Sequence, residues 1–403
     1  MLLASRVPVD ELLVQSMPDA SPTKWHLAHT TWFFERFLLR EDPDYTPVLA
    51  DADYLFNSYY EAIGDRHPRP LRSLLTRPTL DEVLSYRRAV DDRVRARVES
   101  RGLDARTASI LELGIHHEQQ HQELVLTDLK SVLAASPRHP AYIGPAPLEP
   151  SGAAVPELAW LDQPGGLTSI GHEGDGFAFD CEGPRHTVWL EDFAIASRCV
   201  TAGEWLAFVE DGGYRDPACW TSDGFAMAQR EGWCAPLYWE QREGEWRIFT
   251  LRGDVALDPA APVCHVSWYE ADAYARWLAR REPGVRLPTE HEWESVAVRA
   301  PISGRFLETS ALHPEPVTEV GDAPSQMFGD VWEHTASAFS PYPRFRVSDG
   351  ALGEYNGKFM CNQLVLRGGS CLTPRSHVRA SYRNFFPPAA RWQMTGVRLA
   401  RWR

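Results

Sequence analysis

Apolar residues recur every three to four positions along most of the first third of the chain, a pattern that predicts amphipathic helices. The clearest helix begins at a capping box in which Thr79 is followed three residues later by Glu82. Apolar residues follow that box at roughly helical spacing, namely Leu80, Val83, Leu84, Val90 and Val94. The pattern predicts three more helices, over residues 8–17, 22–39 and 107–133. Four such helices pack most economically as a bundle.

The pattern changes in the middle of the chain. Residues 136–158 collect proline, glycine and alanine with almost no periodicity, as interdomain linkers do. Beyond them, short apolar pieces such as 186–196 alternate with glycine, aspartate and proline, and only residues 269–281 show a clear helical pattern. We therefore predict an α+β protein, with a helical bundle over 1–135 and a mixed domain with few regular strands over 159–403.

Composition and charge exclude several classes of protein. The 403 residues are 44% hydrophobic and 11% aromatic, more than a disordered chain carries. A formal net charge of -14 repels phosphate backbones and anionic lipid, so nucleic acid and membrane surfaces are poor partners. No apolar run approaches the roughly 18 residues of a membrane span, and the first residues do not resemble a secretion signal. Seven cysteines without a CxxC pair fit reduced thiols, and we expect a cytoplasmic protein.

Two histidines in the last helix of the predicted bundle face the same side of it. His117 and His121 lie four residues apart, a spacing that places both rings on one face and suits a single metal ion. Ile110, Leu113 and Leu124 share that face, so the pattern turns the histidines toward the bundle interior. Two imidazoles in an apolar interior need a partner.

A third histidine completes a candidate metal site. His29 lies in WHLAHTTWFFE on a second apolar helix, and facing helices of a bundle are where metal sites are assembled. Asp128, eleven residues after His117, indicates that the apolar face of the histidine helix ends about one turn after Leu124. The candidate ligands are therefore three histidines from two helices.

The identity of the metal stays open at this point. Residues 117–121 satisfy HExxH, in which Glu118 would be the general base for a zinc-bound water of a hydrolase. No convincing third-ligand signature follows downstream, and His29 lies upstream in another helix. Three imidazoles on one face leave coordination positions open for substrate and O2, a relative of the plan of non-haem iron oxygenases. Composition does not choose between the two.

Seven segments spread along nearly the whole chain carry longer motifs. In the first half they are SPTKWHLAHTTWFFE (21–35), FNSYYEAIGDRHPRPLR (56–72) and HHEQQHQELVLTDLK (116–130). In the second half they are RLPTEHEWE (286–294), FGDVWEHT (328–335), YNGKFMCNQLVLRGGS (355–370) and YRNFFPPAARWQMTGVRLAR (382–401). Together they resemble the ergothioneine-biosynthesis sulfoxide synthases. Those enzymes join a DinB-like four-helix bundle to a mixed domain of the formylglycine-generating-enzyme type, which is C-type-lectin-like.

The resemblance implies a non-haem iron(II) oxidoreductase. Such enzymes use O2 to join the sulfur of cysteine or γ-glutamylcysteine to C2 of the imidazole of hercynine, Nα-trimethylhistidine, as a sulfoxide. It implies that His29, His117 and His121 hold Fe(II). Tyr59 and Tyr60 match the tyrosine pair of the shorter, cysteine-using branch, in which a phenol near the iron supplies a proton or a hydrogen bond.

The resemblance also implies contacts with both substrates. Arg69 and Arg72 match the arginines that clamp the carboxylate of the thiol donor, a task that suits the guanidinium fork. The residues that match the hercynine pocket are Gln120, Asn384, Phe385 and Phe386. For the two phenylalanines, packing in the core is the competing interpretation.

Three departures from the family pattern bear on the second domain. His334 stands in VWEHT where a structural tryptophan is expected. Only Cys371 follows RGGS, where oxidases of the formylglycine-generating type use paired cysteines, so we expect this domain to be a substrate-binding wall. Phe386 stands where users of γ-glutamylcysteine carry an acidic residue, which favours a smaller donor.

Other functions remain open on the sequence. Selenoneine synthases share this architecture and couple a selenosugar to hercynine, although Arg69 and Arg72 favour a donor with a carboxylate. A zinc-dependent hydrolase or a DinB-like thiol transferase would use the same three histidines. A non-enzymatic binding module would use the lectin-like domain. The sequence does not indicate the oligomeric state.

Overall fold

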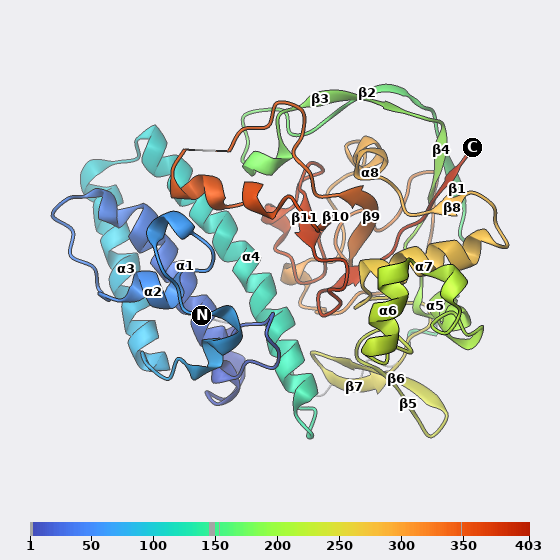
Figure 1. Ribbon diagram of the computed structural model, residues 1–403, viewed down its shortest axis with the longest axis horizontal. Coiled ribbons are helices and arrows are strands. Elements are labelled where there is room, and N and C mark those ends of the chain that lie inside the picture. The colour runs from blue at the N-terminus through green and yellow to red at the C-terminus, as the bar shows by residue number, and fades with distance from the viewer. Residues whose placement is uncertain (1–2, 145–149, 153, 348) are drawn as a thin grey trace. The chain divides into compact units, whose positions relative to one another are not determined.

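The computed structural model describes residues 3–144, 150–152, 154–347 and 349–403. The chain forms two compact units (Figure 1). The helical unit comprises Met1–Tyr142 and Val347–Tyr355, and the mixed unit comprises Ile143–Arg346 and Asn356–Arg403. The short segment Val347–Tyr355 thus groups with the helices, although most of the mixed unit precedes it in the chain.

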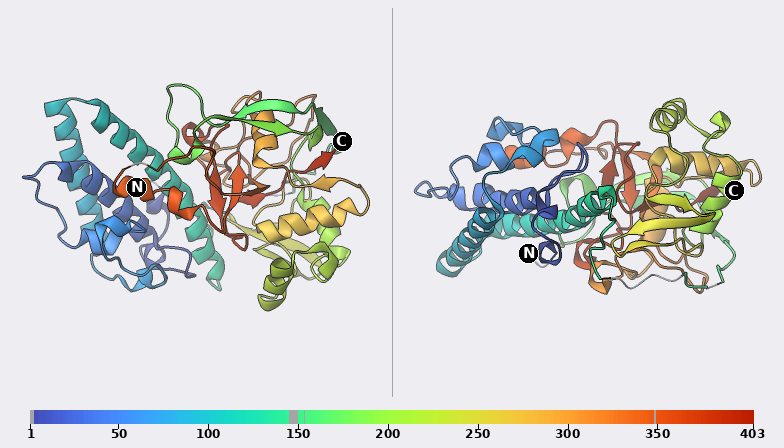
Figure 2. Two further views of the ribbon diagram at one scale, coloured as in Figure 1. Left: turned by 45° about the horizontal axis from the view of Figure 1, so that its top comes forward. Right: turned by 90° about the horizontal axis from the view of Figure 1, so that it is seen from below.

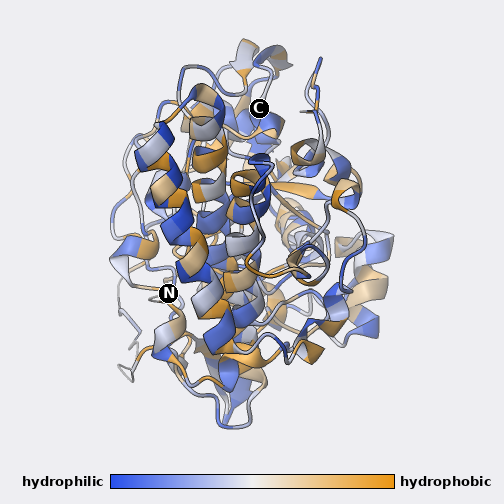
Figure 3. Ribbon diagram, turned by 90° about the vertical axis from the view of Figure 1, so that its left-hand side faces the viewer, coloured by the Kyte–Doolittle hydropathy of each residue, from blue (hydrophilic) through white to orange (hydrophobic). Residues whose placement is uncertain are grey.

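The helical unit is built on α1 (Thr23–Phe37), α2 (Ala52–Phe56), α3 (Leu80–Arg101) and α4 (Ala105–Ala135). Helix α1 packs against both α3 and α4, and it runs beside α4 in both views of Figure 2. Hydrophilic and hydrophobic residues alternate along these helices (Figure 3), as amphipathic helices require. The predicted DinB-like helical region is confirmed. None of the described helices combines the length and the apolarity needed to cross a membrane.

Local side-chain chemistry sets the ends of the two long helices. Thr79 accepts a hydrogen bond from the N–H of Glu82, whose carboxylate accepts one from the N–H of Thr79, so the predicted capping box is present. Helix α3 ends at Gly102, whose φ of 75° favours glycine. Asp104 then caps α4 by accepting from the N–H of Thr107 at 2.7 Å. The chain therefore turns from α3 into α4 through a short loop.

Helices α1 and α4 approach each other closely at Gly114. A Cβ atom at this position would lie 2.3 Å from a ring atom of Phe34, so the approach requires glycine. Gly114 precedes His117 by one turn of α4. The close approach therefore lies next to the predicted metal ligands.

The helix predicted over residues 8–17 does not form. Two short 3-10 turns, Ala4–Arg6 and Glu11–Leu13, occupy this part of the chain. Pro8 supplies no backbone N–H, and the Gln15 side chain donates to backbone carbonyls elsewhere in the unit, which holds the segment as a loop. The additional helix of the unit is the short α2 instead.

The mixed unit contains more helices than the sequence predicted. They are α5 (Ala202–Glu210), α6 (Ser222–Arg230), α7 (Trp268–Ala279) and α8 (Glu290–Ala297). Helix α7 is the one predicted over 269–281. The other three are only eight or nine residues long, too short for a clear periodicity. Two of these short helices, α5 and α8, nevertheless begin with a capping box that is visible in the sequence, such as Thr289 with Glu292.

Short strands form four small sheets in the described part of the mixed unit. The first has the order β1 (Trp160–Gln163), β4 (Phe193–Ala196), β13 (Ala400–Trp402), β8 (Val285–Arg286). The second has the order β11 (Asn384–Phe386), β10 (Leu364–Arg367), β9 (Trp332–Ala338), β12 (Thr395–Gly396). A ribbon pairs β2 (Gly166–Ile170) with β3 (His186–Leu190), and a meander joins β5 (Trp239–Arg242), β6 (Glu245–Thr250) and β7 (Gly253–Ala256). This mixed architecture confirms the predicted fold class.

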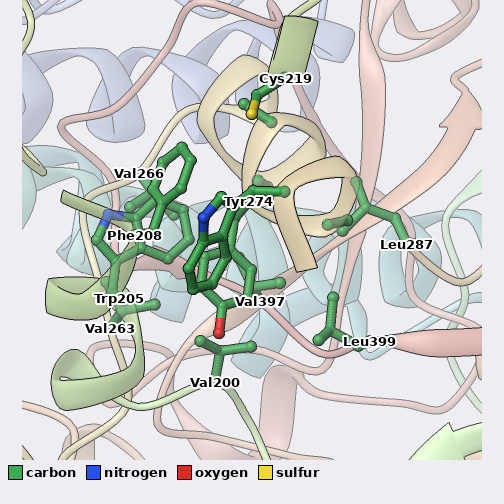
Figure 4. Packing of buried hydrophobic residues seen from close by; sticks show 14 of the residues in the cluster. Val200, Trp205, Phe208, Cys219, Val263, Val266, Tyr274, Leu287, Val397 and Leu399 are labelled. Carbon is green, nitrogen blue, oxygen red and sulfur yellow. The ribbon is translucent and has the colours of Figure 1, made fainter. Parts of the chain in front are cut away.

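Aromatic packing and buried ion pairs hold the mixed unit together. Trp205 of α5 stacks on Tyr274 of α7 with ring centroids 4.8 Å apart, in the cluster shown in Figure 4. Arg383 donates to both carboxylate oxygens of Glu290 at 2.8 and 2.9 Å, and both side chains are buried. This pair ties the residue before β11 to the start of α8, and so fixes the strand that carries Asn384.

Candidate metal centre

Three histidines from two helices converge inside the helical unit. His29 of α1 and His117 of α4 are buried, and His121 of α4 is half-buried. One nitrogen from each ring lies within 4.8 Å of the other two. Among the described residues, no other group of three or more histidine, cysteine, aspartate or glutamate side chains is close enough to share an ion. The structure therefore brings together the three ligands that the sequence predicted.

A hydrogen bond on the outer side of the His29 ring orients its inner nitrogen. His29 Nδ1 donates to the carbonyl of Phe56 at 2.6 Å, which leaves a lone pair on Nε2. That Nε2 lies 3.2 Å from Nε2 of His117, whose own Nδ1 is buried without a partner in the described structure. An acceptor nitrogen this close to a second ring nitrogen requires either a proton or a cation between them. The donor set therefore fits a metal ion.

The three rings are in the protonation state that metal binding needs. Burial lowers the pKa of His117 to about 3, and burial together with neighbouring rings lowers the pKa of His29 and His121 well below the ordinary value. Neutral imidazole is the form that ligates metals. Near neutral pH each ring therefore carries a single proton and keeps one nitrogen lone pair for a cation.

Aromatic side chains of α1 hold the histidine rings from the sides. Trp25 stacks on His29 with centroids 4.6 Å apart and planes 12° from parallel, and Phe33 packs against His117 at 4.7 Å. Trp32 follows His29 by about one turn of the same helix, and the centroids of their rings are 5.6 Å apart. These contacts limit ring rotation, so the cluster is largely preorganised.

Glu118 is engaged away from the cluster. Arg87 of α3 donates to both of its carboxylate oxygens, at 2.9 and 3.2 Å. Arg87 also donates to the Thr30 hydroxyl at 3.1 Å. A carboxylate whose two oxygens both accept from a guanidinium is not directed at a metal-bound water. This pairing weighs against the interpretation of residues 117–121 as a zinc-hydrolase motif.

The interpretation of Asp128 as the end of the apolar face is wrong. Its side chain is buried, at 4% exposure, and Oδ2 accepts a hydrogen bond from the N–H of Ser21 at 2.8 Å. The same oxygen lies 3.0 Å from Nε2 of His26. The buried face of α4 thus continues past Leu124, which is itself half-buried, because polar partners on α1 satisfy the carboxylate.

Tyr59 and Tyr60 follow α2 in a loop beside the cluster. Tyr60 is fully buried, and its ring packs against Phe37 and Trp32. Its hydroxyl lies 3.4 Å from that of Tyr59. Burial raises the pKa of Tyr60 well above the ordinary value, so the hydroxyl keeps its proton. Since Trp32 also contacts His29, one aromatic ring separates the buried phenol from a predicted ligand.

A segment from late in the chain completes this side of the unit. The Tyr355 hydroxyl donates to Oε1 of Gln120, and its ring lies 5.7 Å from His117 and 6.2 Å from Tyr59, centroid to centroid. The Glu354 carboxylate accepts from the backbone N–H groups of the two residues that follow Tyr60, at 2.9 and 2.8 Å. The segment therefore contacts both the histidine helix and the tyrosine loop.

We predict that replacing Glu354 by alanine loosens the tyrosine loop. Its carboxylate satisfies the N–H groups of Glu61 and Ala62, and a lost charge-assisted bond of this kind opens both amides to solvent. Hydrogen exchange at those two amides should become roughly tenfold faster, measured by NMR or mass spectrometry. Replacement of Asp51, an exposed acid before α2, is the control. Unchanged exchange in the Glu354 variant would show that the loop is held by other contacts.

The two predicted arginines differ in their environments. Arg72 is 2% exposed, its guanidinium lies 3.3 Å over the Trp25 ring, and it donates to the hydroxyls of Ser21 and Ser58. None of the described ion pairs involves Arg72, and its Nε has no partner. Arg69 is exposed and donates to a backbone carbonyl at 3.3 Å. Of the two arginines, only Arg72 is therefore buried, and Asp128 is the carboxylate whose charge acts on it.

The other predicted site residues belong to the mixed unit. Asn384, Phe385 and Phe386 form β11, and Phe385 stacks on Phe339 with centroids 4.1 Å apart, as a core residue would. His334 lies buried on β9 with Nε2 3.1 Å from the carbonyl of Val266. Cys371 is buried as well.

Sequence reasoning missed two residues of this site. Tyr355 lies 235 residues after its partner Gln120, and its motif carried no sign of a contact with the helices. His26 lies one turn before His29 on the same helix, and Nδ1 of its ring is 2.8 Å from Nδ1 of His121. The three-residue spacing between His26 and His29 was a signal that could have identified it.

The sequence matches two known families in the order of the two units. Residues 2–125 match the DinB superfamily, and residues 150–321 and 311–403 match the sulfatase-modifying factor enzyme 1-like domain. The two matches together span nearly the whole chain.

Three relatives resemble the chain over different lengths. It is 34% identical to hercynine oxygenase of Mycobacterium tuberculosis, over 97% of this chain and 93% of the relative. Identity to hercynine oxygenase of Mycolicibacterium thermoresistibile is 32%, over 97% and 89%. Identity to ergothioneine biosynthesis protein 1 of Schizosaccharomyces pombe is 25%, over 56% of this chain and 28% of that protein.

Proposed function

Because this chain belongs to the hercynine oxygenase family, we propose that it is an iron(II)-dependent sulfoxide synthase that couples a small thiol to C2 of the hercynine imidazole. As a member of that family the chain is an oxidoreductase. The single observation that carries the iron assignment is the neutral three-histidine cluster between α1 and α4. Ergothioneine biosynthesis is the corresponding pathway, in keeping with the yeast relative.

Fe(II) would be held by His29, His117 and His121. When bound, it supplies a redox centre with open coordination positions for O2 and a thiolate. The protein stacks Trp25 on His29, bonds the outer nitrogen of His29 to a backbone carbonyl, and keeps one nitrogen of each of the three rings within 4.8 Å of the others. Glu118 takes no part, because Arg87 holds it.

Arg72 is the residue best suited to hold the carboxylate of the donor. Its printed hydrogen-bond acceptors are hydroxyls, and a buried guanidinium gains from a further bond to a carboxylate. Its stacking on Trp25, which in turn stacks on His29, places the cation beside the metal ligands. Burial lowers the pKa of Arg72, the charge of Arg69 lowers it further, and the charge of Asp128 opposes both. A thiol that carries a carboxylate, such as cysteine, matches this arrangement.

We predict that Arg72→Gln raises the apparent KM for the thiol donor about 10- to 150-fold, because one charge-assisted interaction with that substrate is lost. The KM for hercynine should change little. Steady-state O2 consumption with each substrate varied in turn measures both constants. The control is Arg88→Gln, since Arg88 is an exposed arginine of α3 that bonds only within its own helix turn. An unchanged donor KM would favour a donor without a carboxylate.

The proton required during coupling is assigned to the tyrosine pair. Tyr60 keeps its proton and lies 3.4 Å from the Tyr59 hydroxyl, so the two phenols can pass a proton between them. Gln120 and Tyr355 lie on the same side as His117 and can orient the imidazole of hercynine through the amide. Asn384, Phe385 and Phe386 remain proposed hercynine contacts, with Phe385 the weakest because its ring already stacks on that of Phe339.

A selenosugar donor is the second candidate. His334 in place of a tryptophan and Phe386 in place of an acid are compatible with it. The buried guanidinium of Arg72 favours a carboxylate, which a sugar lacks, so the sulfur reaction is preferred.

The test is an assay with hercynine and O2 in which cysteine, γ-glutamylcysteine and a selenosugar are compared side by side. The protein is purified anaerobically and loaded with Fe(II), and in parallel with Zn(II). Hercynine-dependent O2 consumption with cysteine, and a sulfoxide of the coupled product by mass spectrometry, is the expected result. Activity with the selenosugar alone would reassign the donor, and hydrolytic activity of the zinc form without O2 uptake would reject the oxygenase.

A further inference from the structure

A second line of hydrogen bonds runs outward from the predicted ligand His121. His26 Nδ1 lies 2.8 Å from His121 Nδ1, and His26 Nε2 lies 3.0 Å from Oδ2 of Asp128. The same carboxylate oxygen accepts from the N–H of Ser21 at 2.8 Å. His26 and Asp128 are 3% and 4% exposed. The chain of contacts therefore links a buried carboxylate on α4 to a metal-ligand candidate on the same helix through a ring on α1.

The positions of the protons in this series of hydrogen bonds follow from the groups at its two ends, Asp128 and His121. An Asp128 carboxylate accepts, so Nε2 of His26 carries the proton and donates to it. The lone pair on His26 Nδ1 then accepts the N–H of His121 Nδ1. His121 is left with its lone pair on Nε2, the ring nitrogen that does not contact His26. One tautomer is thereby imposed on the ligand.

We propose that His26 and Asp128 form a positioning relay that fixes the tautomer and orientation of His121 for metal binding. The proposal rests on the proposed metal function of the three-histidine cluster. His26 is a positioning residue, because it acts through His121. A ligand whose outer nitrogen donates to a carboxylate-linked acceptor is also a stronger base toward a metal.

The His121 ring packs against the rings of His29 and His117, and its Nδ1 meets the His26 side chain. A cavity of about 30 Å³ lies against His26 and His121, lined also by Leu27, Val125 and Thr23. A space of that size holds one or two waters. His29 differs, because a backbone carbonyl accepts from its outer nitrogen and two stacked tryptophans restrain its ring. Between His29 and His121, His121 is therefore the predicted ligand whose outer nitrogen meets a side chain.

Two single substitutions each remove one of the two hydrogen bonds of the His26 ring and keep the other. Asparagine places an amide oxygen where the imidazole has Nδ1, so His26→Asn keeps the acceptor for His121 and loses the bond to Asp128. Glutamine reaches the position of Nε2, so His26→Gln keeps a donor to Asp128 and loses the acceptor for His121. The two variants are matched in polarity and in the removal of the ring.

The readout is the affinity of the protein for Co(II), titrated anaerobically and followed by its visible absorption. His26→Gln should bind Co(II) about 10- to 100-fold more weakly than the wild type, the usual effect of losing an outer hydrogen bond to a ligand. His26→Asn should stay within about threefold. Asp128→Asn removes the charge and keeps an acceptor oxygen, so its affinity for Co(II) should lie between those of His26→Gln and His26→Asn. Thermal melting of each metal-free variant checks that the fold is retained.

Equal Co(II) affinity in the wild type and His26→Gln would overturn the relay, and so would an equal loss in both His26 variants. A wild-type protein that binds neither Co(II) nor Fe(II) would instead reject the proposed metal function. The failure of the relay and the failure of the function are therefore distinguishable.

Discussion

Replacing His117 by alanine should leave the purified protein with almost no iron, whereas the wild type should hold one iron per chain. His117 contributes one of three nitrogens that lie within 4.8 Å of each other, and two imidazoles compete poorly with water and buffer for Fe(II). Coupling of thiol to hercynine should fall to background. Iron content after anaerobic reconstitution and desalting, measured by elemental analysis, gives the result directly.

The free energy of unfolding of the His117→Ala variant should change much less than its iron content. Removal of a buried imidazole opens a cavity that costs on the order of 1–3 kcal/mol, and the close packing of Phe33 and Gly114 against this region stays in place. The matched control is His116→Ala, since His116 is the neighbouring half-buried histidine of α4 and lies outside the cluster. If His117→Ala retained one iron per chain with normal turnover, His117 would not be a ligand.

The sequence predicted the parts of the structure that depend on local spacing. The capping box at Thr79 and the four-residue interval between His117 and His121 are both determined within one or two turns of helix. His29 was found for a similar reason, because an apolar helix in a bundle must turn its few polar residues toward a partner. The long helices α1, α3 and α4 followed from the same periodicity.

The parts that the sequence did not predict depend on partners far away in the chain. Asp128 looks like the polar end of a helix face until His26 and the N–H of Ser21, more than 100 residues earlier, are seen to satisfy it. Tyr355 lies 235 residues after Gln120, the residue whose side chain accepts its hydrogen bond. Residues 8–17 have helical periodicity, but the Gln15 side chain donates to the carbonyls of Ala20 and Arg69, and the segment is held as a loop. In each case tertiary contacts decide, and periodicity does not record them.

The tyrosine pair gives a prediction that separates catalysis from packing. Changing Tyr60 to phenylalanine removes only the hydroxyl, and the ring keeps its contacts with Phe37 and Trp32, so a packing role predicts little change in rate or fold. Because burial keeps the Tyr60 phenol protonated and Tyr59 is its hydroxyl neighbour, we expect the pair to supply the proton. Coupling should then slow about 100-fold or more in the variant that lacks the donor.

The products of that variant should also change. Iron content and the KM for both substrates should persist, while cysteine should accumulate as its sulfinic acid in place of the coupled sulfoxide. Mass spectrometry of the products of Tyr59→Phe, Tyr60→Phe and the double variant shows which hydroxyl matters, since only the variant that lacks the donor should shift the ratio. Wild-type product ratios in the double variant would remove both tyrosines from the chemistry. Because the Tyr355 hydroxyl lies beside Gln120 and His117, it would then be the next phenol to replace.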